Sequence, residues 1–229
     1  MGIYKYAFYK SPNIGIFVKC NDNFIILPLG FASTKTTILS KYLEVTDHIY
    51  VSIADTRLLG PMMVMNNNGI LVSYITSDEE IAALKEKSHL NVERLKTKYT
   101  AIGNLIATND HGAIVSPLCN NVKSQIQDIL GVSVISMSIS GFIQTGVMIV
   151  ATNKGAAADP NISDEEIKTI SDILHVNVEP VTINGGIPYL SSGIIANSKS
   201  VVVGNMTSGP ELIMLSRAFN VWVYVWNLL

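Results

Sequence analysis

Short apolar runs separated by turn residues recur along the chain, and residues 100–117 show the pattern clearly. There the runs NLIAT and AIVS flank the turn Asn109-Asp110-His111-Gly112. Asparagine and glycine tolerate the positive φ angles of tight hairpin turns, so this segment predicts two short strands joined by a turn. Residues 132–140, VSVISMSIS, alternate apolar and polar positions, which is the period of a half-buried strand.

A helix and a further strand follow each predicted pair of strands. Ile167, Ile170, Ile173 and Leu174 recur at helical spacing and give the helix one buried stripe. Capping boxes, in which a serine oxygen and a glutamate carboxylate satisfy unpaired amide donors, are predicted at three helix starts. They are Ser77 with Glu80, Ser163 with Glu166, and Ser208 with Glu211. Helices are predicted to begin near Ser33, Ser77, Asn121, Ser163 and Ser208.

The same order of elements occurs five times. The turn asparagines that mark it are Asn21, Asn66, Asn109, Asn153 and Asn197, at intervals of 45, 43, 44 and 44 residues. A glycine precedes each turn, at Gly15, Gly60, Gly103, Gly146 and Gly193. Self-similarity at such a period is typical of repeat architectures. The predicted repeats, each strand-turn-strand-helix-strand, are approximately 10–54, 55–98, 99–141, 142–185 and 186–229.

One such unit cannot bury both its sheet and the apolar stripe of its helix, but several units packed together can. Radial closure also protects the edges of the sheets. The sequence therefore predicts an α/β protein whose single domain, residues 1–229, is a closed five-fold α/β propeller. The alternative is an ordinary two-domain α/β protein in which the repeats arise by chance.

Composition narrows the functional classes. Hydrophobic residues make up 48% of the chain and charged residues 15%, which excludes a disordered protein. A net charge of −2 and a pI near 6.1 argue against binding through many nucleic-acid phosphates. The uncharged run between Ile129 and Asn153 is long enough to span a membrane, but its alternation favours strands. No signal peptide is predicted at the N-terminus, so we expect a soluble, cytoplasmic protein.

The sequence carries no strong catalytic or metal-binding motif. It has no phosphate-binding loop, no His-Glu-x-x-His and no Gly-x-Ser-x-Gly. The four histidines lie in different repeats, and His111 is expected to be a solvated residue at a turn. Cys20 and Cys119 do not form a Cys-x-x-Cys pair and are expected to be small core or rim residues. We therefore expect no metal, no cofactor and no enzymatic activity.

Several phrases resemble the translation initiation factor 6 family in its archaeal form. They are TAIGNLIATNDHGAIVSP, SIADTRLLGPMMVMNNNGILV, VATNKG and IIANSKSVVVGNMTSGPELIML, and the resemblance runs from about Ile14 to Phe219. It implies a monomeric, pentein-like ribosome anti-association factor. Such a factor binds the large ribosomal subunit at its joining face near the sarcin–ricin loop. Contact is chiefly with a ribosomal protein, with limited rRNA contact, and the factor also accompanies large-subunit maturation.

Two other functions stay open on the same architecture. Guanidine-modifying enzymes, such as arginine deiminases and amidinotransferases, use a nucleophilic cysteine late in the chain together with a histidine. Here the last cysteine is Cys119 and no histidine follows His175, which disfavours that function. A purely structural assembly scaffold would bind precursor particles without affecting the joining of mature subunits.

The resemblance also implies contact residues, in the loops that open the repeats. Asn104 after Gly103 is the first, followed by Leu58 and Pro61 around Gly60, Val147 after Gly146, and Tyr189 before Gly193. Arg57 matches an arginine of some family members. Two of these residues have an alternative role. Asn104 would instead satisfy the backbone of its own loop, and Tyr189 would instead be a partly buried packing residue.

The chain departs from the family pattern at two places. Asp55 stands where the family usually has glycine, so the resemblance fixes neither the conformation of the local turn nor the neighbouring contact of Arg57. The C-terminal segment 220–229, NVWVYVWNLL, extends past the usual end of the relatives. The N-terminal strand is expected to close the fifth unit, which leaves this segment without a partner strand. It either covers an apolar edge or serves in recognition.

Overall fold

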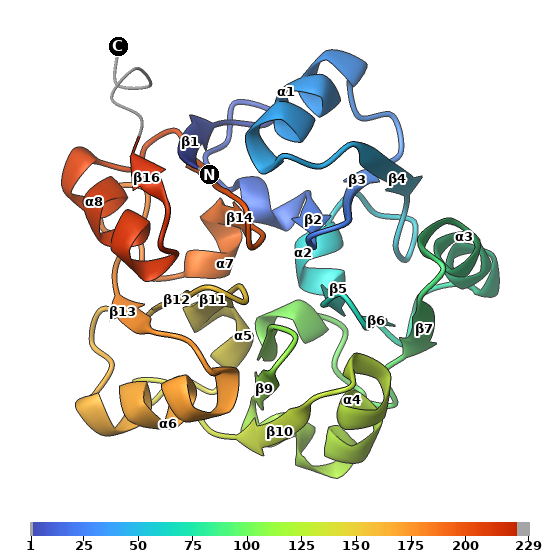
Figure 1. The fold of residues 1–229 in the computed structure, drawn as a ribbon. Coiled ribbons are helices and arrows are strands. Elements are labelled where there is room, and N and C mark those ends of the chain that lie inside the picture. Colours follow the sequence, from blue (N-terminus) through green and yellow to red (C-terminus); the bar gives the residue numbers. More distant parts are fainter. Residues whose placement is uncertain (1, 224–229) are drawn as a thin grey trace.

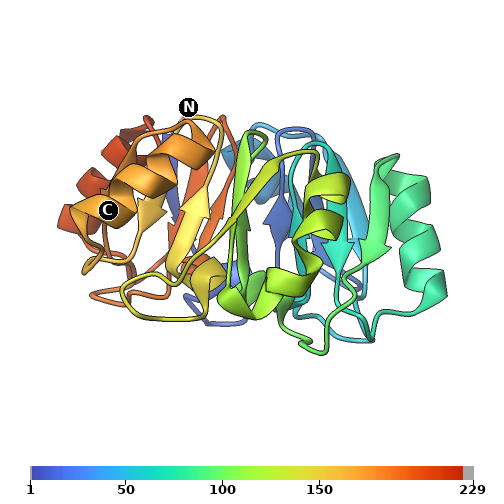
Figure 2. The ribbon, with the colours of Figure 1, turned by 90° about the horizontal axis from the view of Figure 1, so that it is seen from below.

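The computed structural model describes residues 2–223, and in it the chain forms five similar α/β units around a common centre (Figure 1). Each unit has its own small sheet, of three strands in four units and of four strands in the fifth. The mixed α/β fold is therefore as predicted. The sheets are separate, however, and no hydrogen-bonded sheet runs round the ring among the residues described. From the side, the strands run between the two ends of the ring, and long helices lie outside them (Figure 2).

The first unit comprises η1 (Ile14–Ile16), β2 (Lys19–Cys20), β3 (Phe24–Pro28), α1 (Ser33–Leu43) and β4 (Asp47–Val51). The second comprises α2 (Leu59–Met62), β5 (Met63–Met65), β6 (Gly69–Val72), α3 (Asp78–Ser88) and β7 (Asn91–Arg94). The third comprises η2 (Ile102–Asn104), β8 (Ile106–Thr108), β9 (Gly112–Val115), η3 (Pro117–Val122), α4 (Lys123–Leu130) and β10 (Ser133–Ser136).

The fourth unit comprises α5 (Thr145–Met148), β11 (Ile149–Ala151), β12 (Ala156–Ala158), α6 (Asp164–Leu174) and β13 (Val178–Pro180). The fifth comprises α7 (Leu190–Gly193), β14 (Ile194–Ala196), β15 (Val201–Gly204), α8 (Gly209–Ala218) and β16 (Trp222–Val223), together with β1 (Gly2–Tyr6) from the N-terminus. In the first four units the first two strands are antiparallel, and the third is parallel to the second. A parallel pair needs a crossover connection, which the long helix supplies.

The local predictions for the helices are confirmed. All three capping boxes are formed, at the start of α3, α6 and α8. The uncharged run from Ile129 to Asn153 is divided among the end of α4, β10, α5 and β11. No helix among residues 2–223 has both the length and the apolar character needed to cross a bilayer.

The fifth unit differs from the others because the N-terminal strand enters its sheet. β1 pairs in parallel with β15, as expected for a strand that closes this unit. In the sheet of the fifth unit, β1 thereby occupies the position that β4, β7, β10 and β13 occupy in the other four sheets. β16 pairs with the far side of β1, at Gly2 and Ile3. The prediction that the C-terminal segment has no partner strand is therefore wrong for Trp222–Val223, and residues 224–229 lie outside the described residues.

Two of the predicted repeat markers are also shifted. Four of the turn asparagines use the side-chain oxygen to accept two backbone N–H groups of their own turn. In the fourth unit Thr152, not Asn153, occupies this position, and its hydroxyl accepts from Lys154 N. Likewise Ser191, not Gly193, is the fifth equivalent of the glycines, because its carbonyl is the one that Gly15 packs against. With Thr152 and Ser191 as markers, both series have intervals of 45, 43, 43 and 45 residues.

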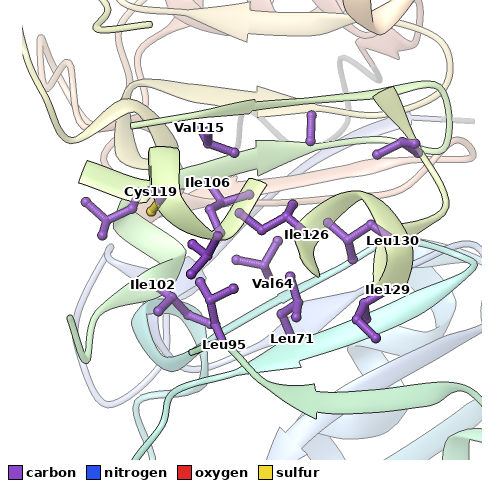
Figure 3. Close-up of a cluster of buried hydrophobic side chains, with 14 residues drawn as sticks. Val64, Leu71, Leu95, Ile102, Ile106, Val115, Cys119, Ile126, Ile129 and Leu130 are labelled. Carbon is purple, nitrogen blue, oxygen red and sulfur yellow. The ribbon is translucent and has the colours of Figure 1, made fainter. Parts of the chain in front are cut away.

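The hydrophobic cores lie between neighbouring units. In the cluster of Figure 3, Val64 and Leu71 come from the second unit, whereas Ile106, Val115 and the α4 residues Ile126, Ile129 and Leu130 come from the third. These side chains are almost completely buried. Each unit thus depends on its neighbour for burial of its apolar surface, as the repeat argument requires.

Backbone and polar contacts join the units at both ends of the ring. At one end the short helices touch in the order η1, α2, η2, α5, α7 and back to η1. At the other end the amide of Asn21 donates to Asn66 O, that of Asn66 to Asn109 O, and that of Asn109 to Thr152 O. The amide of Asn197 donates to Asn21 O, which links the fifth unit to the first. We call the first end the loop face and the second the asparagine end.

Candidate functional site

The loop face consists of the five short helices, the segments that lead into them, and the segments that join each second strand to its long helix. All six contact residues implied by the sequence lie on it. Arg57, Leu58 and Pro61 belong to α2 and the segment before it, Asn104 ends η2, Val147 is in α5, and Tyr189 precedes α7. Four different units therefore present these residues at equivalent positions on one end of the ring.

Tight turns with positive φ angles precede four of the short helices. Their tips are Tyr9-Lys10, Ala54-Asp55, Ser140-Gly141 and Asn184-Gly185-Gly186. Asp55 has a φ of 55°, in the left-handed region that glycine occupies at little cost. Ile53 and Thr56 still form the bridge across this turn. Gly141, at the equivalent place in the fourth unit, has a φ of 80°, so the aspartate occupies the same left-handed region as a glycine of this fold.

The capping-box glutamates also hold these turns in place. Glu80 accepts from Ala54 N at 2.8 Å and Asp55 N at 3.1 Å, besides its own cap. Glu211 accepts from Gly185 N, Gly186 N and Ser208 N, at 2.7–3.1 Å. Burial alone would raise the pKa of Glu211, but hydrogen bonds from Ser208, Thr182 and the turn amides outweigh it and lower the pKa to about 2. The carboxylates of Glu80 and Glu211 thus hold two of the loop-face turns by hydrogen bonds.

Large apolar side chains are exposed over most of the loop face. Of thirteen exposed large hydrophobic residues identified within residues 2–223, ten lie on this face. They are Tyr9, Leu29, Leu58, Tyr74, Ile75, Phe142, Ile143, Ile187, Tyr189 and Met206. Exposed apolar groups gathered on one face mark an interaction surface. Of the ten, only Leu58 and Tyr189 were predicted; the signal for the others is an apolar residue at a turn, where polar residues are the rule.

The residues around α2 differ in exposure. The Arg57 side chain is exposed and has no carboxylate partner among residues 2–223. Leu58 is 39% exposed, and its backbone N–H donates to Thr56 Oγ1. Pro61 is half-buried within the short helix. Arg57 and Leu58 are therefore more exposed than Pro61.

Asn104, Val147 and Tyr189 have distinct surroundings. Asn104 lines a groove of about 460 Å³ with Lys98, Tyr99 and Gln144, and within residues 2–223 its side chain forms no hydrogen bond. No hydrogen bond therefore supports the alternative in which the Asn104 side chain satisfies the backbone of its own loop. Val147 is partly buried against the core of the fourth unit. Tyr189 is 48% exposed, more than a packing residue would be.

The centre of the ring holds a cavity of about 80 Å³, and Cys20 is in its wall. Burial raises the pKa of Cys20 to about 12 and that of Cys119, which is in a core, to about 11. Both thiols are protonated at neutral pH and are therefore poor nucleophiles. The Cys20 thiol donates to Ala196 O at 3.3 Å, and no histidine is in the cavity wall.

The histidines and acidic residues form no metal site among the described residues. His111 is exposed at its turn, as expected, and its ring packs edge-on against His175 at 5.8 Å between centroids. His48 is hydrogen-bonded to Ser40 of its own unit. These contacts give the histidines structural surroundings rather than a shared site.

A comparison with protein families agrees with the fold. A family model described as the eIF-6 family matches residues 3–218, which include the first four units and the fifth except for Gly2 and β16. The chain belongs to the eIF-6 family. Within that family, it is 49% identical over 220 residues to the Translation initiation factor 6 of Nitrosopumilus maritimus, covering 96% of this chain and 99% of the relative. The identity is 48% to the Cenarchaeum symbiosum protein of the same name, with the same coverage, and 36% to that of Methanocaldococcus jannaschii, covering 95% and 97%.

The eIF-6 family match does not reach the C-terminal end of the fifth unit. It ends at Ala218, the last residue of α8, so β16 and the C-terminal segment lie outside it. The relatives are named as translation initiation factors, and those names indicate no catalytic activity. The loop face, by contrast, lies entirely within the match.

Proposed function

We propose that this eIF-6 family member binds the large ribosomal subunit at its joining face and sterically prevents association with the small subunit. The observation that carries the proposal is the gathering of exposed apolar side chains from four units on the loop face. A surface of this kind fits a protein partner better than bare RNA. The main partner is then a ribosomal protein near the sarcin–ricin loop, with limited rRNA contact. The names of the relatives support a role in translation initiation.

The proposed mechanism needs no chemistry. We infer that residues 1–229 form one domain, a closed five-fold propeller of the pentein kind, which acts as a monomer in the cytoplasm. A domain of this length has a radius of gyration of about 17 Å. An object of that size on the joining face prevents close approach of the small subunit by excluded volume. The same occupancy during assembly would make the protein a factor in large-subunit maturation.

Within the loop face, Leu58 and Tyr189 serve as apolar anchors, Arg57 pairs with a carboxylate or carbonyl of the partner, and Asn104 donates or accepts a hydrogen bond. Pro61 and Val147 shape the surface between them. The half-exposed tyrosine and the exposed arginine are the residue types that dominate binding energy at interfaces. The protonated thiols disfavour the guanidine-modifying alternative.

Gradient sedimentation of purified large and small subunits, with and without the protein, tests the function. We expect the protein to migrate with the large subunit and to reduce the fraction of joined ribosomes. Binding only to precursor particles, with joining unaffected at saturating protein, would favour the scaffold function instead. Unchanged migration of every particle would exclude both.

Substitutions on the loop face test whether it is the surface that binds the large subunit. Leu58→Ser with Tyr189→Ser is expected to weaken binding to the large subunit by about 100-fold or more, because each anchor contributes on the order of 2 kcal/mol. The matched control is Ile213→Ser on α8, an exposed apolar residue outside the loop face, which should bind normally. Asn104→Ser should weaken binding without changing the melting temperature. An equal loss for the Ile213 control would show that binding does not depend on the loop face.

A further inference from the structure

The third unit opens differently from the other four. In those four units a tight turn with positive φ angles, closed by an isolated bridge, precedes the short helix. Residues 96–101, which precede η2 and are all described by the structure, contain neither a bridge nor a positive φ angle. Two hollows, of about 410 Å³ and 460 Å³, lie along this segment instead. They adjoin, because Lys98, Tyr99 and Leu118 line both of them, and we call the two together the lysine groove.

Charge also distinguishes the lysine groove. Lys96 and Lys98 are exposed in its wall, which contains no aspartate or glutamate, and neither lysine forms an ion pair within residues 2–223. The Lys98 amine lies 5.4 Å from the centre of the Tyr99 ring. In the second, fourth and fifth units a capping-box glutamate accepts from the opening turn, whereas here the neutral side chain of Gln125 accepts from Lys96 N at 2.9 Å. Glu93 accepts from Gln125 outside the wall, which leaves one carboxylate against two lysines. The groove therefore favours an anionic partner.

The uncharged part of the wall suits a peptide. Asn104 and Gln144 line one hollow and Asn121 lines the other, and within residues 2–223 these three side chains form no hydrogen bond. Side-chain amides both donate and accept, so they can bond the N–H and C=O groups of an extended chain. Tyr99 and Leu118 are half-buried and offer apolar contact between the lysines. Two lysines on a chain of net charge −2 neutralise few phosphates, which makes an acidic peptide a better fit than an RNA strand.

We propose that the lysine groove binds an extended acidic segment of a protein partner. Carboxylates of that segment pair with Lys96 and Lys98, and an apolar side chain between them packs on Tyr99 and Leu118. The inference rests on the proposed function, because the groove belongs to the loop face and includes Asn104. It adds a charged contact to the apolar anchors of that face, and a charged contact makes binding depend on salt.

Fluorescence anisotropy of labelled nonapeptides on the isolated protein tests the groove without the ribosome. One probe alternates glutamate with leucine, and the other alternates glutamine with leucine. We expect the glutamate peptide to bind roughly five- to tenfold more tightly at low ionic strength, and this preference should shrink as salt is added. Lys96→Gln with Lys98→Gln should remove the preference. Lys10→Gln with Lys35→Gln, which changes the net charge equally at two lysines of the first unit, is the control and should retain it.

Equal binding of the two peptides would overturn the proposal, as would no binding of either at millimolar concentration. Tighter binding of a uridylate oligonucleotide than of the glutamate peptide, lost in the Lys96 and Lys98 variant, would assign the groove to RNA and overturn it as well. Gradient sedimentation gives a separate measurement, in which the same variant should bind the large subunit more weakly and with less dependence on salt. If the natural protein did not migrate with the large subunit, the proposed function would fail, while the peptide titration would still decide what the groove binds.

Discussion

The two ends of the ring use polar and apolar side chains in opposite ways. At the asparagine end, buried asparagines donate to backbone carbonyls of the next unit, and the ring of Asp22, Asn67, Asp110, Asn153 and Ser198 lies over them. At the loop face the polar groups, chiefly the capping-box glutamates, hold turns from below, while tyrosines and aliphatic side chains are exposed.

This difference separates stability from recognition. The polar groups of the asparagine end bind one another, so that end has little left to offer a partner. The loop face leaves its apolar side chains uncovered on turns that the glutamates hold by hydrogen bonds, and such preorganisation reduces the entropic cost of binding. Changes at the asparagine end should therefore affect unfolding, and changes at the tips of the loop face should affect binding.

The largest effect is expected beneath the loop face, where the short helices touch. A Cβ on Gly103 would lie 2.0 Å from Gly60 O. Gly103→Ala forces the two backbones apart, and we expect a loss of roughly 3 kcal/mol or more in the free energy of unfolding, measured by denaturant titration. Gly209→Ala, at a glycine where an added Cβ would meet no atom within 4 Å, is the control and should change stability little. Similar losses for both variants would mean that the close approach of the two backbones is not the reason why Gly103 is needed.

The next effect concerns the asparagine end. Asn66 is buried; its amide donates to Asn109 O and Leu130 O, and its oxygen accepts from Asn68 N and Gly69 N. Asn66→Ala leaves these groups unpaired, and we expect about 2–3 kcal/mol of destabilisation in urea. The folded fraction should still bind the large subunit with natural affinity. Weakened binding at a temperature where the variant is fully folded would contradict the separation of the two ends.

The sequence predicts the repeated part of this molecule well, because turn asparagines, capping boxes and strand periods are local signals. Two markers were shifted: the role of Asn153 belongs to Thr152, and that of Gly193 to Ser191. A threonine hydroxyl replaces an asparagine oxygen in the turn, and a serine fits where glycine is usual, so residue identity alone misplaced both by one or two positions.

Non-local features could not be predicted in the same way. The pairing of β1 with β15 was expected from the family resemblance and not from a local pattern, and the pairing of β16 with the far side of β1 was not predicted. The effect of an aspartate at position 55 does not follow from the sequence either, because the turn is held by Glu80, 25 residues further along the chain, which accepts from Ala54 N and Asp55 N. The loop-face residues were located from the family resemblance, but their exposure depends on tertiary packing.

A smaller effect, which depends on pH, is expected from the glutamates that hold the loop-face turns. Because the folded pKa of Glu211 is about 2, below the value near 4.5 for a free glutamate, the carboxylate contributes stability above pH 4.5. That contribution is lost as pH falls toward 2. Glu211→Gln should destabilise by about 1–2 kcal/mol at pH 7, and the difference from the natural protein should shrink between pH 4.5 and 2. Chemical denaturation across that range measures it.

Glu166→Gln is the matched comparison, because Glu166 binds one turn amide, Ser140 N, where Glu211 binds two. The pKa of Glu166 is also lowered: its burial raises the pKa, and the bonds from Ser163 and Ser140 outweigh that effect. Its variant should show the same dependence on pH with a smaller amplitude. An equal or larger amplitude would mean that the turn amides are not the source of the stabilisation.

The smallest effect is expected at the tip of a loop-face turn, and it is a gain. Asp55 holds a left-handed conformation, which costs an L-residue about 1 kcal/mol and glycine almost nothing. Asp55→Gly should raise the urea midpoint by an amount equivalent to about 0.5 kcal/mol, since glycine's greater freedom in the unfolded chain offsets part of the gain. Asp55→Ala should lower it, because alanine tolerates the left-handed conformation less well than aspartate does. If glycine proved less stable than aspartate, the carboxylate itself would be stabilising the turn, and the loop face would depend on its tip residues as well as on the glutamates beneath them.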